Sequence, residues 1–187
     1  MDYEIILTVL MGIGLSASSG FRIFIPFLLI SIAALTGYLS LSDSFSWIGT
    51  YPALITFSVA VILEIAAYYI PWVDNFLDTI ASPIAVIAGI VLMASVITGI
   101  SPLLKWALAI IAGGGVAATI QSLTGIVRAT SSVTTGGIGN SVVSSIELGG
   151  SVVMAIAAML VPVIAFAVVV VLTLLSLRFL FKKINQN

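Results

Sequence analysis

Charged side chains are rare in this chain, and several of them fall in or beside its most apolar stretches. The sequence is 61% hydrophobic and only 7% charged. An ionised side chain near the centre of a bilayer costs about 2.5 kcal/mol or more, so such residues are paired, face water or take part in function. Six residues meet this description: the carboxylates Glu64, Asp74, Asp78 and Glu147 and the arginines Arg22 and Arg128. They are the first candidates for a functional site.

The two aspartates lie four residues apart, between Pro71 and Pro83. This spacing predicts a short re-entrant or interfacial helix that presents Asp74 and Asp78 on one face, with Asn75 beside them. Their oxygens suit Na⁺, another hard cation or a proton. A helix cap exposed at the membrane surface is the structural alternative.

Glu64 is the acid placed deepest in an apolar stretch. It precedes the end of that stretch at Ile70 by six residues, about 9 Å along a helix. Two roles are open for it: a proton relay, or a buried ion pair with Arg22 or Arg128. The arginines in turn could recognise an anionic headgroup or carboxylate, because the guanidinium fork suits both, or could lock the bundle through ion pairs.

A segment rich in small polar residues runs from 124 to 150. Asn140, Ser144 and Glu147 share one helical face there, directly after the glycines at 136, 137 and 139, which predict a break in the backbone. Such a face can line a substrate path, but small residues also allow helices to pack closely.

The composition excludes several classes of chemistry. The chain has no histidine and no cysteine, so thiol redox chemistry, Cys/His zinc sites and imidazole catalysis are absent. The net charge of −1 gives no basic surface for nucleic acid. No Gly-x-Ser-x-Gly motif occurs, and Gly113 to Gly115 lack the lysine of a phosphate loop. We expect no catalytic residue and no cofactor other than a hard cation such as Na⁺, and the metal itself is unknown.

Six apolar segments predict an all-α polytopic membrane protein with a single transmembrane domain, 1–187. The segments are 5–15, 21–39, 51–70, 83–100, 103–123 and 148–181. Residues 16–20 are small, so the first two segments form either a hairpin or one interrupted helix. The last segment is long enough to tilt, protrude or kink at Pro162. Aromatic residues near the ends of the segments are expected at the membrane interfaces: Trp47, Tyr51, Tyr68, Tyr69, Trp72 and Trp106.

Two faint echoes within the sequence predict a degenerate internal repeat with halves 1–100 and 101–187. Residues 70–84 aligned with 135–149 match Asn75 with Asn140, and Gly20-Phe21-Arg22 resembles Gly125-Ile126-Val127-Arg128. Repeats with interrupted helices are common in secondary transporters.

The same residues resemble a bacterial integral membrane protein family catalogued as a domain of unknown function. The resemblance covers nearly the whole chain and rests on the motif from Gly14 to Arg22, on the run from Pro71 to Asp78, and on Arg128 followed by Asn140, Ser144 and Glu147. It implies an integral membrane fold and no established activity. The bacterial inner membrane is the expected location. Ile70 departs from the basic residue expected there in many relatives, which leaves Arg22 or Arg128 as the partner of the acids.

Taken together, these features favour a small transporter or channel for a small solute or amphiphile, coupled to H⁺ or Na⁺ through the carboxylates. A structural or assembly subunit is the alternative, and a lipid-handling enzyme is less favoured; a homo-oligomer is also open. An even number of crossings, with Arg178, Lys182 and Lys183 near the C-terminus, predicts that both termini are cytoplasmic.

Overall fold

The computed structural model describes residues 2–184, with the side chains of residues 2, 71–79, 177 and 179–184 outside that description. Within this range the regular elements are all helices. They are α1 (Asp2–Phe21), α2 (Phe24–Leu35), the 3₁₀-helix η1 (Asp43–Gly49), α3 (Tyr51–Tyr68), α4 (Pro71–Val96), α5 (Pro102–Leu108), the π-helix η2 (Ala109–Gly114), α6 (Gly115–Thr135), α7 (Asn140–Leu160) and α8 (Pro162–Ile184). The prediction of an all-α polytopic protein is confirmed.

Prolines and glycines set many of the helix boundaries. Proline has no amide hydrogen, which costs nothing in the first turn of a helix. It occupies an N-terminal position in α3, α4, α5 and α8. Thr50 and Ser101 cap α3 and α5 by accepting hydrogen bonds from Ala53 N and Leu104 N, each at 3.4 Å. At the other end of a helix, Gly136 terminates α6 in the left-handed conformation, with φ of +62°.

The four described helices long and apolar enough to cross a membrane make this a membrane protein. They are Tyr3–Phe21, Tyr51–Tyr68, Pro102–Thr135 and Asn140–Leu160. Shorter apolar helices cover Phe24–Leu35, Ile80–Val96 and Pro162–Ser176. The outward face of α3 exposes Ile55, Val59 and Ile62, as expected of a surface in contact with lipid.

The first helix is the centre of the packing, in contact with α4, α6, α7 and α8. Small residues allow these close approaches. Ser16 Oγ donates to Gly89 O on α4 at 2.8 Å, and Ser18 Oγ donates to Ser151 O on α7 at 2.8 Å. A Cβ on Gly20 would lie 2.6 Å from Ile120 Cβ on α6. Serine and glycine in α1 therefore serve close helix packing.

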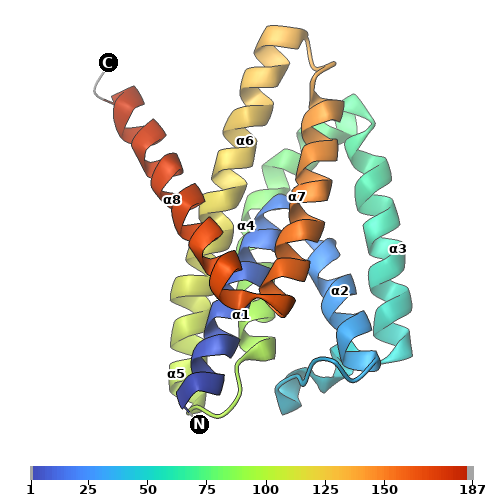
Figure 1. Ribbon diagram of the computed structural model, residues 1–187. Coiled ribbons are helices and arrows are strands. Elements are labelled where there is room, and N and C mark those ends of the chain that lie inside the picture. Colours follow the sequence, from blue (N-terminus) through green and yellow to red (C-terminus); the bar gives the residue numbers. More distant parts are fainter. Residues whose placement is uncertain (1, 185–187) are drawn as a thin grey trace.

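The first two apolar segments form a hairpin, which decides between the two predicted alternatives. Residues 16–20 remain helical within α1, and the break falls at Arg22 and Ile23. Pro26 explains this position, because its missing amide hydrogen and its ring prevent a continuing helix from bonding to the Arg22 carbonyl. Figure 1 shows α2 returning beside α1 toward the end of the bundle where α1 begins.

Three predicted boundaries differ from the structure. The helix that carries Asp74 and Asp78 does not end at Pro83, because α4 continues through it to Val96. The helix predicted over 103–123 does not end at residue 123, because α6 extends to Thr135; it ends at the predicted break, where Gly136 and Gly137 have positive φ. The long segment 148–181 belongs to two helices: Val161 leaves helical geometry at φ −141° and ψ 67°, and α8 begins at Pro162.

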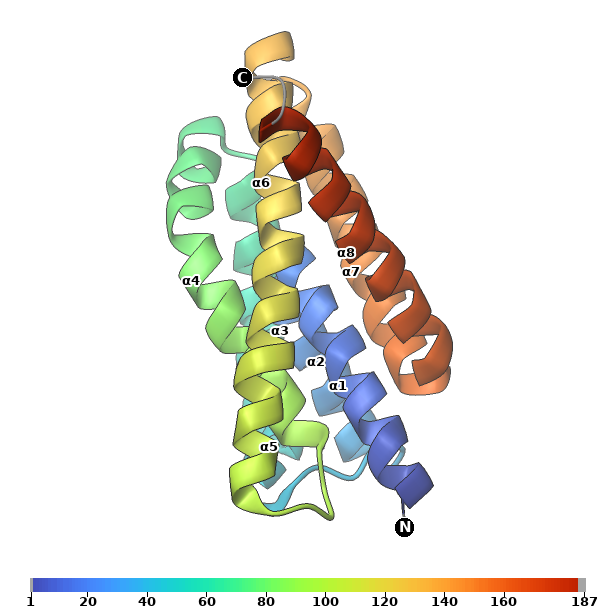
Figure 2. The same cartoon turned by 90° about the vertical axis from the view of Figure 1, so that its left-hand side faces the viewer.

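The two ends of the described chain lie at opposite ends of the bundle. In the two perpendicular views, α1 begins at the lower end and α8 runs to the upper end (Figures 1 and 2). The α1–α2 hairpin and the reversal at Pro162 account for the extra changes of direction. This arrangement removes the even number of crossings on which the expectation of two cytoplasmic termini depended.

Candidate functional site

Both arginines singled out in the sequence are buried, and both pair with one glutamate. Arg22 follows the end of α1, Arg128 lies on α6 and Glu147 on α7, and their exposed fractions are 2%, 3% and 4%. Arg128 Nε donates to Glu147 Oε1 at 2.9 Å, and its Nη2 contacts Glu147 Oε2. Arg22 Nη2 lies 3.5 Å from the same Oε2. The prediction that an arginine pairs with one of the acids is confirmed for both arginines.

Ser144 connects the two arginines one turn before Glu147 on α7. Its carbonyl oxygen accepts a hydrogen bond from Arg22 Nη2 at 3.0 Å, and its hydroxyl oxygen accepts one from Arg128 Nη2 at 3.1 Å. Asn140 lies one further turn back and donates from Nδ2 to Ser132 Oγ on α6 at 2.9 Å. Asn140, Ser144 and Glu147 are all buried, so the predicted shared face of α7 is confirmed.

Tyr68 completes this arrangement from the end of α3. The Arg22 guanidinium carbon lies 3.8 Å from the centre of its ring, and that of Arg128 lies 4.4 Å away. Both distances are those of cation–π contacts, which gain strength where water is excluded. We name Arg22, Tyr68, Arg128, Ser144 and Glu147 the arginine cluster. It joins α1, α3, α6 and α7 inside the bundle.

The buried position of Tyr68 corrects the expectation that it anchors the bundle at the interface, because its exposed fraction is 8%. Tyr69, the next residue, is 50% exposed and fits the interfacial role. The sequence did contain a signal for Tyr68: it follows Glu64 by four residues and so shares its helix face. A neighbouring buried charge distinguishes such an aromatic residue from an interfacial one.

Glu64 is also buried, but its partners are backbone amides at the break between α1 and α2. Its Oε1 accepts a hydrogen bond from Ile23 N at 2.8 Å, and its Oε2 accepts one from Phe24 N at 3.1 Å. Ile23 has no polar side chain with which to cap α2. A carboxylate from α3 therefore satisfies two open amides and lies at the positive end of the α2 dipole. No sequence pattern links Glu64 to these backbone groups, so the contact could not be predicted.

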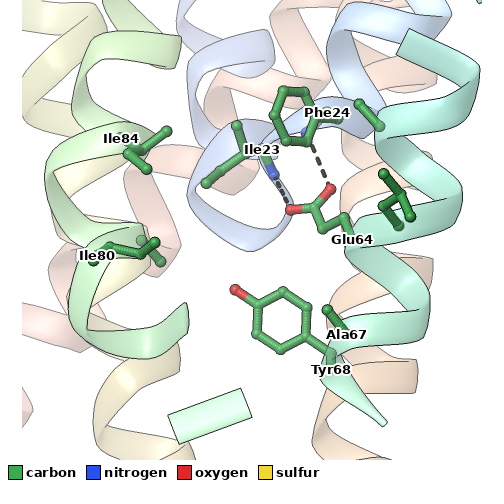
Figure 3. Close-up of a pocket in the computed structure, with 10 residues that line it drawn as sticks. Ile23, Phe24, Glu64, Ala67, Tyr68, Ile80 and Ile84 are labelled. Carbon is green, nitrogen blue, oxygen red and sulfur yellow. Dashed lines mark hydrogen bonds between the residues drawn. The ribbon is translucent and has the colours of Figure 1, made fainter. Parts of the chain in front are cut away.

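A cavity of about 410 Å³ lies next to Glu64, between α3 and α4. Figure 3 shows the carboxylate facing this space, with Tyr68 beneath it and α4 opposite. The lining is apolar apart from Glu64 and Tyr68: the other residues are Ile23, Phe24, Ala60, Leu63, Ala67, Ile80, Ala81 and Ile84. Leu63 and Ile84 are 63% and 40% exposed, so the cavity opens on the side of the bundle. We name it the α3–α4 cavity.

The three remaining predicted site residues lie in the first turns of α4. The structure gives the backbone there as helical, but the side chains of Asp74, Asn75 and Asp78 lie outside the described residues. Among the residues that are described, no group of three or more acidic side chains could hold a metal ion. A Na⁺ site that includes the two aspartates remains a prediction.

The two arginines of the predicted repeat lie close together in the structure. The sequence similarity around them did not predict this proximity. Arg22 follows the end of α1 and Arg128 lies near the end of α6, and both reach the same tyrosine and the same glutamate. Their local surroundings differ, because Gly20 is in tight contact with α6 whereas Gly125 has open space around it. The internal duplication stays a prediction.

Comparison with known proteins assigns the chain to a family. No curated protein and no solved structure matches the chain. One family model matches residues 9–182, which is nearly the whole chain and includes the arginine cluster, Glu64 and the lining of the α3–α4 cavity. The chain therefore belongs to the family described as Domain of unknown function (DUF4126).

Proposed function

We propose that this protein is a small transporter of the bacterial inner membrane that moves a small solute or amphiphile, coupled to H⁺ or Na⁺ through its buried carboxylates. One observation carries the proposal: Glu64 faces a cavity that opens on the side of the bundle. A cavity of about 410 Å³ is within the range of small-molecule sites, roughly 300–1,000 Å³. A buried ionisable group beside such a space is suited to bind an ion or exchange a proton.

The break between α1 and α2 supports the same proposal. Interrupted helices present unpaired backbone groups at membrane depth, and transporters use them to hold ions and substrates. Here Glu64 occupies the open amides of Ile23 and Phe24. Loss of its charge would free at least one of these amides for another acceptor, which would couple the ionisation of Glu64 to the binding of a solute.

The positions of the basic residues support one orientation of the chain in the membrane. Arg178, Lys182 and Lys183 lie near the end of α8, and cytoplasmic segments are enriched in Lys and Arg. This end is therefore assigned to the cytoplasm, and the beginning of α1 to the opposite side. The chain has no native cysteine, so single cysteines at Tyr3 and Ile138 can be labelled with an impermeant maleimide. Labelling of both positions from the same side of the membrane would contradict this orientation.

A structural or assembly subunit is the second candidate, and the arginine cluster favours it. Two guanidinium groups bonded to one glutamate and stacked on one ring form a rigid joint among four helices. A protein whose polar interior consisted only of such joints would need no substrate. The presence of an open cavity beside Glu64 favours transport over this alternative. Catalysis is not part of either proposal.

Flux across a reconstituted membrane tests transport. The purified chain in proteoliposomes, under an imposed pH or Na⁺ gradient, is expected to acidify or alkalinise the lumen when the correct solute class is added. Glu64→Gln should abolish the coupled flux because it removes the ionisable group. Glu4→Gln is the matched control, since Glu4 is an exposed glutamate near the start of α1. Equal flux in the wild type and both variants, with the fold intact, would leave the structural subunit as the better description.

A further inference from the structure

Arg22 is buried with two of its nitrogen atoms unused. Its exposed fraction is 2%, and among the residues that the structure describes its Nε and Nη1 have no hydrogen-bond acceptor. Buried donors of a charged group are rarely left without a partner, because the cost of removing them from water is not recovered. The third nitrogen, Nη2, is engaged with Ser144 and Glu147. Arg22 therefore retains the capacity to bind an acceptor.

This arginine lies next to the α3–α4 cavity in two ways. It directly precedes Ile23 in the chain, and its guanidinium group stacks on Tyr68, and both of these residues line the cavity. The amides of Ile23 and Phe24 lie at the same place and are occupied by Glu64. A guanidinium group that contacts one lining residue, and the amides of two other lining residues, thus lie beside the same apolar space.

The sum of the buried charges that the structure describes indicates the sign of a ligand. The described interior holds two guanidinium groups, Arg22 and Arg128, and two carboxylates, Glu64 and Glu147, which balance. Among the described side chains, a proton on Glu64 would leave one positive charge in excess, and it would release at least one of the two amides at the positive end of a helix. An anionic ligand would restore the balance, whereas a cation would increase the excess.

We propose that the α3–α4 cavity binds a single-chain anionic amphiphile, an alkyl carboxylate, whose chain occupies the apolar space and whose headgroup replaces Glu64 at the α2 amides and reaches Arg22. This proposal rests on the proposed function and names its substrate class. Entry is lateral, because the exposed Leu63 and Ile84 at the opening are apolar and face the side of the bundle. Glu64 acts as a resident anion that must be protonated before the ligand can take its place.

Several charged or titratable groups surround Glu64 and enter the pH dependence. Arg22 attracts its charge and Glu147, on α7, repels it, and Tyr68 lies one turn further along α3. Arg128, on α6, is bonded to Glu147. Asp74 and Asp78 lie in the first turns of α4, and their side chains are outside the described residues. Among the described side chains, Glu64 is the acid that holds the α2 amides, so the proton is assigned to Glu64.

Binding of radiolabelled decanoate to the full chain in nanodiscs of neutral lipid tests the proposal. We expect saturable binding that weakens as the pH rises, because deprotonated Glu64 competes for the same donors. Each molecule bound should be accompanied by the uptake of about one proton in weakly buffered solution. Decyltrimethylammonium and decanol have the same chain without the negative charge and should bind at least about tenfold more weakly, the factor expected for loss of a charged hydrogen bond.

Three variants test separately the binding of the headgroup, the binding of the alkyl chain and the role of the proton on Glu64. Arg22→Gln should lose about tenfold or more in decanoate affinity, with partial recovery in Arg22→Lys. Ala67→Leu should fill the cavity and block binding while leaving every charged group in place. Glu64→Gln should bind decanoate with little dependence on pH, because its neutral side chain imitates the protonated acid. Glu4→Gln should bind as the wild type does.

The outcomes distinguish this inference from the transport proposal. Decanoate binding with the expected pH dependence, but without flux, would support the binding site and overturn transport. Proton-coupled flux of another solute, with no binding of decanoate, would overturn the anionic amphiphile and leave transport standing. Tighter binding of the ammonium amphiphile, lost in Glu64→Gln, would reverse the assigned charge. Unchanged decanoate binding in Ala67→Leu would place the ligand outside this cavity.

Discussion

Glu147 and Glu64 are both buried, but one is surrounded by guanidinium groups and the other by backbone amides and a cavity. Glu147 contacts Arg128 with both of its oxygens and lies 3.5 Å from Arg22. Glu64 accepts hydrogen bonds from Ile23 N and Phe24 N and faces open space. The first arrangement fixes charges of opposite sign against one another. The second leaves a single charge beside an open space, where the proposed ligand would replace it.

Burial of a charge does not by itself indicate function. A carboxylate bonded to two arginines is costly to disturb, since any change leaves an uncompensated charge in the interior. A carboxylate at the start of a helix is stabilised by about 0.3–1 kcal/mol when exposed and up to about 2 kcal/mol when partly buried. Under the proposed mechanism, the weaker stabilisation at Glu64 would permit exchange, while the stronger one at Glu147 would maintain the frame around it.

The largest effect is expected when this comparison is tested at Glu147. Glu147→Gln removes the charge that both arginines share, and loss of one partner of a buried pair costs about 3–5 kcal/mol. We expect a large loss in the free energy of unfolding, measured by denaturant titration in detergent micelles. Glu4→Gln, at an exposed position, should change it by no more than about 0.5 kcal/mol.

A double variant tests whether Arg128 and Glu147 stabilise the fold as a pair. Arg128→Met combined with Glu147→Leu removes the bidentate pair and leaves one arginine, so it should recover part of the loss seen in Glu147→Gln. Additive losses from the two sites would contradict an ion pair that functions as one unit. In that case the arginine cluster could not be regarded as the fixed half of the comparison.

The next largest effect concerns the contact that holds α1 against α6 near the arginines. Gly20→Ala would place a Cβ 2.6 Å from Ile120 Cβ and 2.8 Å from Ala117 O, and overpacking of this kind costs about 1–3 kcal/mol. Gly125→Ala is the matched control from the faint repeat, because nothing lies within 4 Å of the added atom. Its higher helix propensity should leave the stability unchanged or raise it by up to about 1 kcal/mol. Equal losses at both glycines would instead indicate that α1 and α6 pack in equivalent ways.

These two regions were not equally accessible from the sequence. The arginine cluster could be predicted in outline, because Arg22, Arg128 and Glu147 are charged residues in apolar surroundings and must find partners. The shared face of Asn140, Ser144 and Glu147 followed from helical spacing. Which acid would pair with which arginine could not be derived, since that depends on how α1, α6 and α7 approach one another through serine and glycine contacts.

The surroundings of Glu64 were beyond sequence reasoning for a different reason. Its partners are backbone amides, and those amides are available only because Pro26 ends the helix at Arg22 and the chain turns back into α2. Both a hairpin and an interrupted helix were compatible with the small residues at 16–20. The same ambiguity affected Pro83 and Pro162: one lies inside α4, and the other begins α8. A proline restricts the backbone locally, but packing decides whether the helix continues.

The smallest effect on stability is expected at Glu64, and it is the one that decides the comparison. Glu64→Gln keeps an oxygen that can accept one of the two amide hydrogens and removes the interaction of a charge with the α2 dipole, a loss of about 1–2 kcal/mol. The same chemical change should therefore cost clearly less at Glu64 than at Glu147, although it should abolish the proposed proton coupling. Denaturant titrations of the two variants, run side by side, measure this difference directly. A loss of about 3–5 kcal/mol at Glu64 would show that its carboxylate is as firmly fixed as that of Glu147, and a group so fixed could not give up its place to a ligand.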